Sequence, residues 1–275
     1  MEIPYRKVLT IDEFTDFGIE IETENLKFDE AEKKLRKQLD DSWQIKQDKS
    51  LKDFGLEIAS PILYNNKETW MNLKKLAKTL KYLNPEYTNC SFQVNLSIEN
   101  FNEEDIINFL KFYSAYEEII IRISKGDDKT LRETFEEFAR PISLKAFEYI
   151  KIFGNQKTIE AFESNKQESI SLKLNKAKYK KALIEFRSPN STDNIGLWQN
   201  YITLFYYMLK YVKDKNYDKE KIDYLFERCY IKRDIESILE YNKIKKAIEL
   251  ADMIFKEDID KCLFLEQYEQ KTYIK

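Results

Sequence analysis

The sequence predicts a mixed α+β protein, in which an antiparallel-rich sheet has one face covered by helices. Short segments with alternating apolar and polar side chains, as in strands, occur in turn with longer segments whose apolar residues repeat at helical spacing. The chain of 275 residues, 43% of them hydrophobic, is long enough to bury a large core without disulfide bonds. We therefore expect an α+β core over residues 1–196 and a helical C-terminal part, residues 197–275, packed on that core.

The clearest strand is DFGIEIE, residues 16–22. Its phenylalanine and two isoleucines alternate with Gly18, Glu20 and Glu22, which places both carboxylates on the same side of the strand, about 7 Å apart. Two carboxylates this close repel each other unless they are solvated, share a proton or hold a cation. Taken alone, the pattern favours a solvated outer face of an antiparallel strand.

Further strands are predicted at residues 43–47, 55–61, 90–97, 169–175 and 182–188. Residues 48–50 form an expected turn, and a lysine-rich turn is expected to join the last two strands into a hairpin. In the last four of these strands the apolar side chains again lie on one side. The opposite side carries polar residues, namely Glu57, Gln93, Asn95, Glu185 and Arg187.

Helices are predicted at residues 28–41, 67–83, 103–121 and 127–139 in the core, and at 197–212, 219–229, 231–241 and 244–255 in the C-terminal part. Asp29 is the expected N-cap of the first helix. Residues 125–128 form an expected polar loop. Arg122, Lys125 and Arg132 lie in or beside this loop, where they either reach a bound phosphate or, more simply, are solvated.

The amino-acid composition limits which catalytic mechanisms and which partners the sequence predicts. The chain contains no histidine, which excludes Ser-His-Asp and Cys-His catalysis as well as histidine metal ligands. Its three cysteines form no CxxC pair, as expected for reduced thiols in a cytoplasmic protein without a structural zinc site. The net charge of −3 gives no footprint for nucleic acid, and neither a signal peptide nor a membrane-spanning segment is expected.

If helices cover the apolar face of the sheet, the opposite face collects four carboxylates, two amides and one guanidinium, from Glu20, Glu22, Glu57, Glu185, Gln93, Asn95 and Arg187. Four carboxylates in one cleft need counter-cations, and hard oxygen ligands select Mg²⁺ or Mn²⁺. Divalent cations together with an arginine suit phosphoryl groups.

The polar residues of this face lie in four motifs: FGIEIE (17–22), QDKSLKDFGLEIASPIL (47–63), NCSFQVNLS (89–97) and IEFRSP (184–189). The ordered set resembles the amidoligase family, within the wider glutamine synthetase and glutamate–cysteine ligase-like carboxylate–amine ligases. The motifs occur in the order and at the approximate spacing of that family, over about the first two-thirds of the chain. The resemblance implies a glutamine synthetase-like ligase core.

The resemblance also implies roles for individual residues. Two groups of metal ligands would flank a site for the phosphates of ATP, one made of Glu20, Gln93 and Glu185, the other of Glu22, Glu57 and Asp48. Arg187 would hold the transferred phosphate, with Glu57 and Asp48 beside it as further catalytic candidates, and ATP would contact Gln93, Asn95, Arg187 and Lys125. Amidoligases usually have a His-x-His pair where this chain has Gln93-Val94-Asn95, and an amide is a weaker metal ligand than a carboxylate.

The activity implied by the resemblance is the ATP-dependent joining of a carboxylate and an amine, on small molecules or peptides, through an acyl phosphate and with two divalent metal ions. Without histidine, the proton of the incoming ammonium would pass to a carboxylate or to water. Two alternatives stay open. One is a catalytically degenerate ligase fold that serves as a binding module, and the other is a two-metal hydrolase or nuclease, against which the net negative charge counts.

Overall fold

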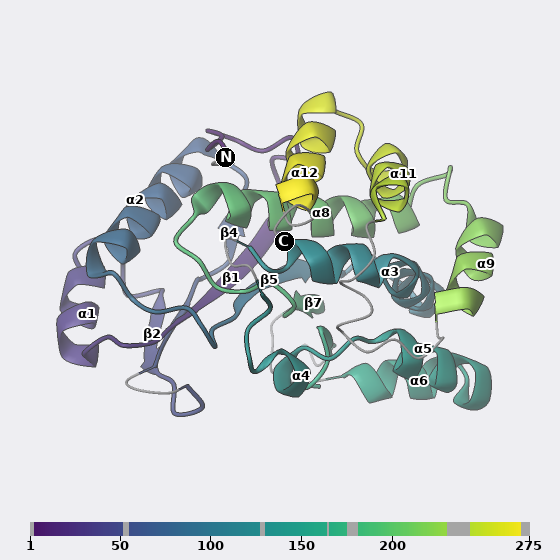
Figure 1. Ribbon diagram of the computed structural model, residues 1–275, viewed down its shortest axis with the longest axis horizontal. Coiled ribbons are helices and arrows are strands. Elements are labelled where there is room, and N and C mark those ends of the chain that lie inside the picture. The colour runs from purple at the N-terminus through teal and green to yellow at the C-terminus, as the bar shows by residue number, and fades with distance from the viewer. Residues whose placement is uncertain are drawn as a thin grey trace.

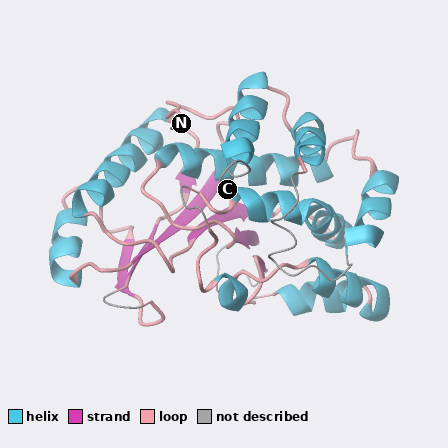
Figure 2. Ribbon diagram, viewed as in Figure 1, coloured by secondary structure: helices cyan, strands magenta, loops and turns pink. Residues whose placement is uncertain are grey.

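The computed structural model describes residues 3–51, 55–126, 130–163, 165–174, 181–229 and 243–270. Within these residues a seven-stranded antiparallel sheet runs through the middle of the molecule, with helices packed along one side of it (Figure 1, Figure 2). The α+β class predicted from the sequence is therefore confirmed. In the described ranges, no helix is both long enough and apolar enough to cross a lipid bilayer.

The strands of the sheet are β1 (Asp16–Thr23), β2 (Gln44–Gln47), β3 (Leu56–Ala59), β4 (Leu63–Tyr64), β5 (Phe92–Ser97), β6 (Ile170–Lys173) and β7 (Leu183–Phe186). They lie in the order β2-β3-β1-β5-β7-β6, and β4 pairs with the start of β1. The predicted hairpin is present as the antiparallel pair of β6 and β7, although most of its lysine-rich turn lies outside the described residues. Pro61, which has no backbone N–H, lies between the end of β3 and the start of β4.

The helices of the described residues are α1 (Phe28–Leu35), α2 (Lys67–Leu83), α3 (Glu103–Ile123), α4 (Phe135–Phe138), α5 (Ser143–Glu148), the π-helix η1 (Tyr149–Phe153), α6 (Asn155–Phe162), α8 (Ile195–Val212), α9 (Lys219–Cys229), α11 (Ile244–Ile254) and α12 (Asp258–Gln270). The predicted bounds of α2 and α9 are matched residue for residue. The helix predicted at residues 231–241 lies outside the described residues.

Two predicted helices are shorter in the structure than in the sequence pattern. The helix expected at 28–41 ends at Leu35, and Asp29 does not cap it, because the N-cap position is Lys27. Beyond Leu35 local side-chain bonds compete with the helix: Asp40 accepts the backbone N–H of Ser42 at 2.8 Å. Of the helix expected at 127–139, residues 127–129 lie outside the described residues, residues 130–134 are not helical, and α4 accounts for residues 135–138.

Several elements carried no clear pattern in the sequence and were not predicted. They are β4, the helical run α5–η1–α6 and the last helix, α12. In α12 the residues that face the core include Asp260 and Gln267 as well as Leu263, Phe264 and Tyr268, so no one-sided apolar stripe marks it. A helix that buries polar groups is set by its tertiary partners rather than by its own periodicity.

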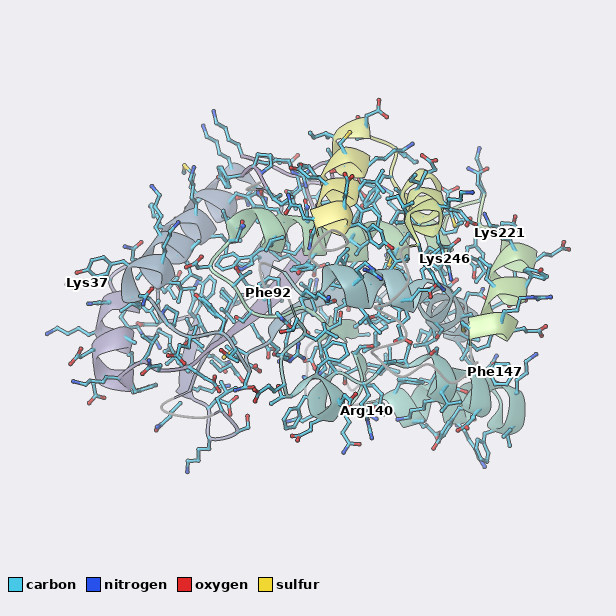
Figure 3. The ribbon with its side chains drawn as sticks, viewed as in Figure 1. Lys37, Phe92, Arg140, Phe147, Lys221 and Lys246 are labelled. Carbon is cyan, nitrogen blue, oxygen red and sulfur yellow. The ribbon has the colours of Figure 1, made fainter. Side chains whose placement is uncertain are left out.

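The apolar face of the sheet packs against α3 and α8. Phe92 of β5 stacks on Trp198 of α8 with ring centroids 5.7 Å apart, near the centre of the molecule (Figure 3). Phe186 of β7 stacks on Phe205 of α8 with centroids 4.1 Å apart. Burying one such ring stabilises the fold by about 1.5–3 kcal/mol. Because side chains alternate along a strand, the residues between these apolar ones point to the opposite face of the sheet.

The N-terminal segment ties the C-terminal helices to the sheet. Arg6 donates to Asp260 of α12 at 2.5 Å and to Thr203 of α8 at 3.1 Å, and Asn65, just after β4, donates to the carbonyls of Leu9 and Ile11. Apolar residues of the strands, α8, α11 and α12 belong to one hydrophobic cluster. The C-terminal helices that the structure describes thus pack on the core, while a division into two units at residue 196 stays a prediction.

Candidate functional site

The strand register brings the predicted polar residues to one face of the sheet. Across β1 and β3, Glu22 is paired with Glu57, and across β1 and β5, Glu20 is paired with Gln93. Asn95 of β5 is paired in turn with Glu185 of β7. Paired residues in an antiparallel ladder project to the same face and lie close together. Residues that are far apart in the chain therefore form a continuous polar surface across β3, β1, β5 and β7.

A cavity of about 820 Å³ lies over this face. Nearly all of the predicted site residues line it, namely Glu20, Glu22, Asp48, Glu57, Gln93, Asn95, Glu185 and Arg187. Lys125 is the exception, because it is not among the lining residues and its carbonyl accepts from Asn190 Nδ2 at 3.4 Å, at the end of α3. Arg132 also lines the cavity, as do residues that the sequence did not single out, among them Lys46, Ser91, Lys173 and Lys181.

Glu20 is buried beside two other carboxylates, those of Glu185 and Glu57. Burial, together with the negative charges of Glu185 and Glu57, raises the pKa of Glu20 to about 7, against the opposing effects of Asn95 and Arg187. Asn95 Nδ2 donates to Glu20 Oε1 at 3.2 Å. A positive charge placed among these carboxylates would relieve their mutual repulsion.

Glu22 is held in a fixed orientation by backbone and side-chain donors. The N–H of Ser91 donates to Oε2 at 2.6 Å, and Gln93 Nε2 donates to Oε1 at 3.2 Å. Burial raises the pKa of Glu22, while the bonds from Ser91 and the charges of Arg132 and Arg187 oppose that rise. The carboxylate therefore has partners on both oxygens and a positive field beside it.

Glu185 and Arg187 form an ion pair on β7 and just after it. Arg187 Nη1 donates to Glu185 Oε1 at 2.8 Å, and Lys173 of β6 lies 3.3 Å from the same oxygen. Arg187 Nε donates to the carbonyl of Phe138 at 3.3 Å. Within the described part of the chain, Nη2 of Arg187 has no hydrogen-bond partner, so that this edge of the guanidinium is available to an anion.

The two remaining carboxylates lie toward β2. Glu57 Oε1 is 3.7 Å from Lys46 Nζ, a loose and partly solvated pair that is worth little to stability. Asp48 accepts from the N–H and the hydroxyl of Ser50, at 2.8 and 2.7 Å, as an aspartate in a turn commonly does. Asp48 therefore lines the cavity, but one of its oxygens already serves the turn.

Arg132 is the main residue of the site that the sequence interpretation placed wrongly. It is 4% exposed rather than solvated, and burial lowers its pKa to about 10, which still leaves it charged at neutral pH. Its guanidinium donates to the carbonyls of Arg187, Ser188 and Pro189 at 2.8 to 3.1 Å. Arg132 thus fixes the backbone that follows β7 and carries Arg187. Neither its charge nor its spacing in the sequence distinguished it from a solvated residue.

Arg122 is also buried rather than solvated. It is 4% exposed within α3, and its guanidinium lies 5.7 Å from the ring centroid of Tyr268 on α12. It is not among the residues that line the cavity. Its contacts join α3 to α12, so that the structure gives it no place in the candidate site.

Gln93 connects the acidic and basic parts of the site. Its Oε1 accepts from Arg187 Nη1 at 3.0 Å, while its Nε2 donates to Glu22 and to the hydroxyl of Ser91. The oxygen is the atom through which an amide would bind a metal ion. In this structure that oxygen is engaged by Arg187.

The donor set partly suits a hard divalent cation. Carboxylates of five predicted residues line the cavity, and burial together with the charges of Glu185 and Glu57 raises the pKa of Glu20. Across the described ranges, no three Cys, Asp or Glu side chains are grouped so that they can hold a metal ion. Mg²⁺ commonly takes one or two protein carboxylates and completes its shell with phosphate oxygens and water. The residues therefore fit Mg²⁺ bound together with a polyphosphate better than an ion held by protein alone.

Comparison with known families gives one finding that bears on this cavity. A family described as "putative amidoligase enzyme" matches residues 13–208, which is more than half of the chain. The matched range contains every strand named above and all the residues of the candidate site. No curated protein matches the chain.

Proposed function

Because the chain belongs to the amidoligase family, we propose that it is an ATP-dependent ligase that joins a carboxylate to an amine through an acyl phosphate. The observation that carries this proposal is that carboxylates from β1, β3 and β7 line the same cavity as two arginines. ATP would supply the phosphoryl group that activates the substrate carboxylate, with Mg²⁺ or Mn²⁺ neutralising part of its charge.

Each side chain has a role that its contacts support. Arg187 would bind a phosphoryl oxygen through Nη2, because its other nitrogens are held by Gln93, Glu185 and the carbonyl of Phe138. Glu20, Glu22, Glu57 and Glu185 are the proposed carboxylate ligands of the metal ions. Arg132 would act indirectly, by holding the backbone of residues 187–189 in place.

Thermal unfolding with and without millimolar Mg-ATP tests the proposal. A ligand at 100 times its Kd stabilises the folded state by about 2.7 kcal/mol, which gives a clear rise in melting temperature. The variants Glu20→Ala and Arg187→Ala should lose this rise. As a matched control, Arg140→Ala, at the position labelled in Figure 3, removes an arginine that is not among the lining residues and should keep the rise.

Detection of the reaction itself completes the test. The wild-type protein should release ADP and phosphate only when a carboxylate and an amine are both supplied, and a panel of amino acids and short peptides covers both substrate classes. Binding of Mg-ATP without any turnover over that panel would leave the ligase proposal without support.

One observation favours a second candidate, a ligase fold that serves as a binding module. Two of the carboxylates of the cavity already have cationic partners within the chain, Glu185 with Lys173 and Arg187, and Glu57 with Lys46. A protein that had lost metal binding would be stable with such internal pairs. The same thermal experiment separates the two candidates, because a binding module of this kind should show no shift with Mg-ATP.

A further inference from the structure

We propose that Gln93 is a positioning residue that keeps Glu22 and Arg187 from forming a direct ion pair. The role rests on the proposed ligase function, in which a carboxylate and a guanidinium act on the same bound polyphosphate. It replaces the metal-ligand role that the sequence suggests for Gln93. The amide acts as an uncharged spacer between the two charges.

The contacts on both sides of Gln93 support this role. Nε2 lies 3.2 Å from Glu22 Oε1, and Oε1 lies 3.0 Å from Arg187 Nη1. Gln93 is 3% exposed, so that its side chain has little room to turn away. The amide therefore gives the carboxylate and the guanidinium each a neutral hydrogen-bond partner in place of the other.

The orientation of this amide follows from the chemistry of its neighbours. A guanidinium only donates hydrogen bonds, so the atom that faces Arg187 must be the amide oxygen. An ionised carboxylate only accepts, so the atom that faces Glu22 must be the amide nitrogen. The opposite orientation would set two donors against each other on one side and two acceptors on the other.

Without the spacer, Glu22 and Arg187 would neutralise each other. Glu22 and Arg187 both hydrogen-bond to the same amide, so the two charges lie close to each other. In a buried site two opposite charges at hydrogen-bond distance attract strongly. A direct pair would draw the guanidinium away from an anion and the carboxylate away from a cation. Gln93 satisfies both groups with neutral partners and leaves each charge for a ligand.

Asn95 provides the contrast on the same strand. It donates to Glu20 at 3.2 Å, and no hydrogen bond of Arg187 to Asn95 exists in the described structure. The next polar position of β5 thus supports a carboxylate without separating it from Arg187. The spacer role belongs to Gln93.

The first test is a crystal structure of Gln93→Met, in which the side chain keeps its length but loses both polar atoms. Gln93→Leu is the second variant, for use if the first one does not fold. Arg187 should move to within hydrogen-bond distance of Glu22 in the variant, whereas Asn95→Leu should leave Arg187 on Gln93. An Arg187 that stays on Glu185 without touching Glu22 would overturn the proposal.

The second test measures the affinity for tripolyphosphate in the presence of EDTA by calorimetry. Gln93→Met should weaken binding by about 10- to 100-fold, because Arg187, once paired with Glu22, no longer gives the anion a charged hydrogen bond. Glu22→Gln should then raise the affinity in the Gln93→Met background, because Arg187 loses its new partner. This gain should be at least tenfold larger than the effect of Glu22→Gln in the wild-type background. A merely structural role of Gln93 would give equal effects of Glu22→Gln in the two backgrounds and would contradict the spacer role.

The two proposals fail in different ways. If the wild-type protein binds neither tripolyphosphate nor Mg-ATP, the ligase proposal fails, and the position of Arg187 in the variant crystal structure still decides the role of Gln93. If the wild type binds both ligands and Gln93→Met binds them equally well, the spacer proposal fails and the ligase proposal stands.

Discussion

Two neighbouring glutamates of α3 should make opposite contributions to the pH dependence of stability. Glu117 is buried and accepts from the backbone N–H groups of Ile142 and Ser143 at 2.6 and 3.0 Å, at the start of α5. Glu118, the next residue, is bridged by Lys243 and Lys246 (Figure 3) at 2.6 and 2.7 Å. Among the described residues, the hydrogen bonds to Glu117 come from neutral groups, whereas Glu118 pairs with two cations.

Burial outweighs the hydrogen bonds at Glu117 and raises its pKa to about 7. In the unfolded chain the pKa returns to an ordinary value of about 4.3. Between these two values the folded state binds more protons than the unfolded state, so the free energy of unfolding falls as the pH rises. Each pKa unit corresponds to about 1.4 kcal/mol, which gives a loss of about 3 kcal/mol from pH 4 to pH 8. The contribution is complete at the acid end and is lost as the pH passes 7.

Glu118 provides the matched control. Burial alone would raise the pKa of Glu118, but the ion pairs with Lys246 and Lys243 outweigh burial and lower it. A lowered pKa gives stability that is present above the unfolded value and is lost as the pH falls through the folded one. Between pH 5 and 8, therefore, Glu118 should contribute a constant amount.

The assay is urea unfolding of the wild type, Glu117→Gln and Glu118→Gln from pH 5 to 8. The difference in unfolding free energy between the wild type and Glu117→Gln should fall by about 2–3 kcal/mol over this range. Any fixed loss caused by the altered hydrogen bonds cancels from the slope. The difference for Glu118→Gln should stay level. A level difference for Glu117→Gln as well would refute the argument from burial, and carbon-13 NMR of labelled glutamate would measure the pKa directly.

Three further predictions concern the site and its support. Arg132→Met should destabilise the protein by about 3 kcal/mol or more in urea unfolding, because three buried carbonyls lose their donor, and a loss below about 1 kcal/mol would show that water replaces it. Gly196→Ala should lower the melting temperature, since its Cβ would lie 2.3 Å from the carbonyl oxygen of Ile3, whereas Gly18→Ala, with its nearest neighbour at 3.5 Å, should not. Equal melting temperatures for both would mean that the N-terminal segment does not pack against α8. In calorimetry, the protein should bind Mg²⁺ at least tenfold more tightly when ATP is present, and ATP at least tenfold more tightly when Mg²⁺ is present. Affinities that do not depend on the other ligand would contradict the argument from the charge balance of the cavity.

The face of the sheet could be predicted from the sequence because strand alternation is a local property. Once Ile19 and Ile21 are assigned to the core, Glu20 and Glu22 must point to the other side, and the same holds for Val94 between the amides of β5. The antiparallel register then aligns these positions across neighbouring strands. Only the pairing itself, which determines which carboxylates meet, needs the structure.

The sequence could not predict residues whose position is set by distant partners. Arg132 looks like any charged residue of a polar segment, and it turns inward because the carbonyls of residues 187–189 are there to receive it. The role of Gln93 is equally hidden, since it depends on Glu22 from β1 and Arg187 after β7 reaching the same amide. Polar side chains whose hydrogen-bond partners are distant in the sequence leave no local pattern. Their roles are therefore the hardest to predict from the sequence.

The balance of charge in the cavity explains why its carboxylates are not clustered as metal ligands. Of the described residues that line the cavity, six are acidic and six basic, namely Asp16, Glu20, Glu22, Asp48, Glu57 and Glu185, and Lys46, Arg132, Lys166, Lys173, Lys181 and Arg187. Several of them pair with one another, as Lys181 does with Asp16 at 2.6 Å. A site for a bare cation would need an excess of acid, and a site for a bare polyanion an excess of base. A cavity with equal numbers of acidic and basic residues instead suits a ligand that carries both signs, such as a metal–triphosphate complex. The charges of such a ligand would exchange partners with the internal pairs rather than add to them.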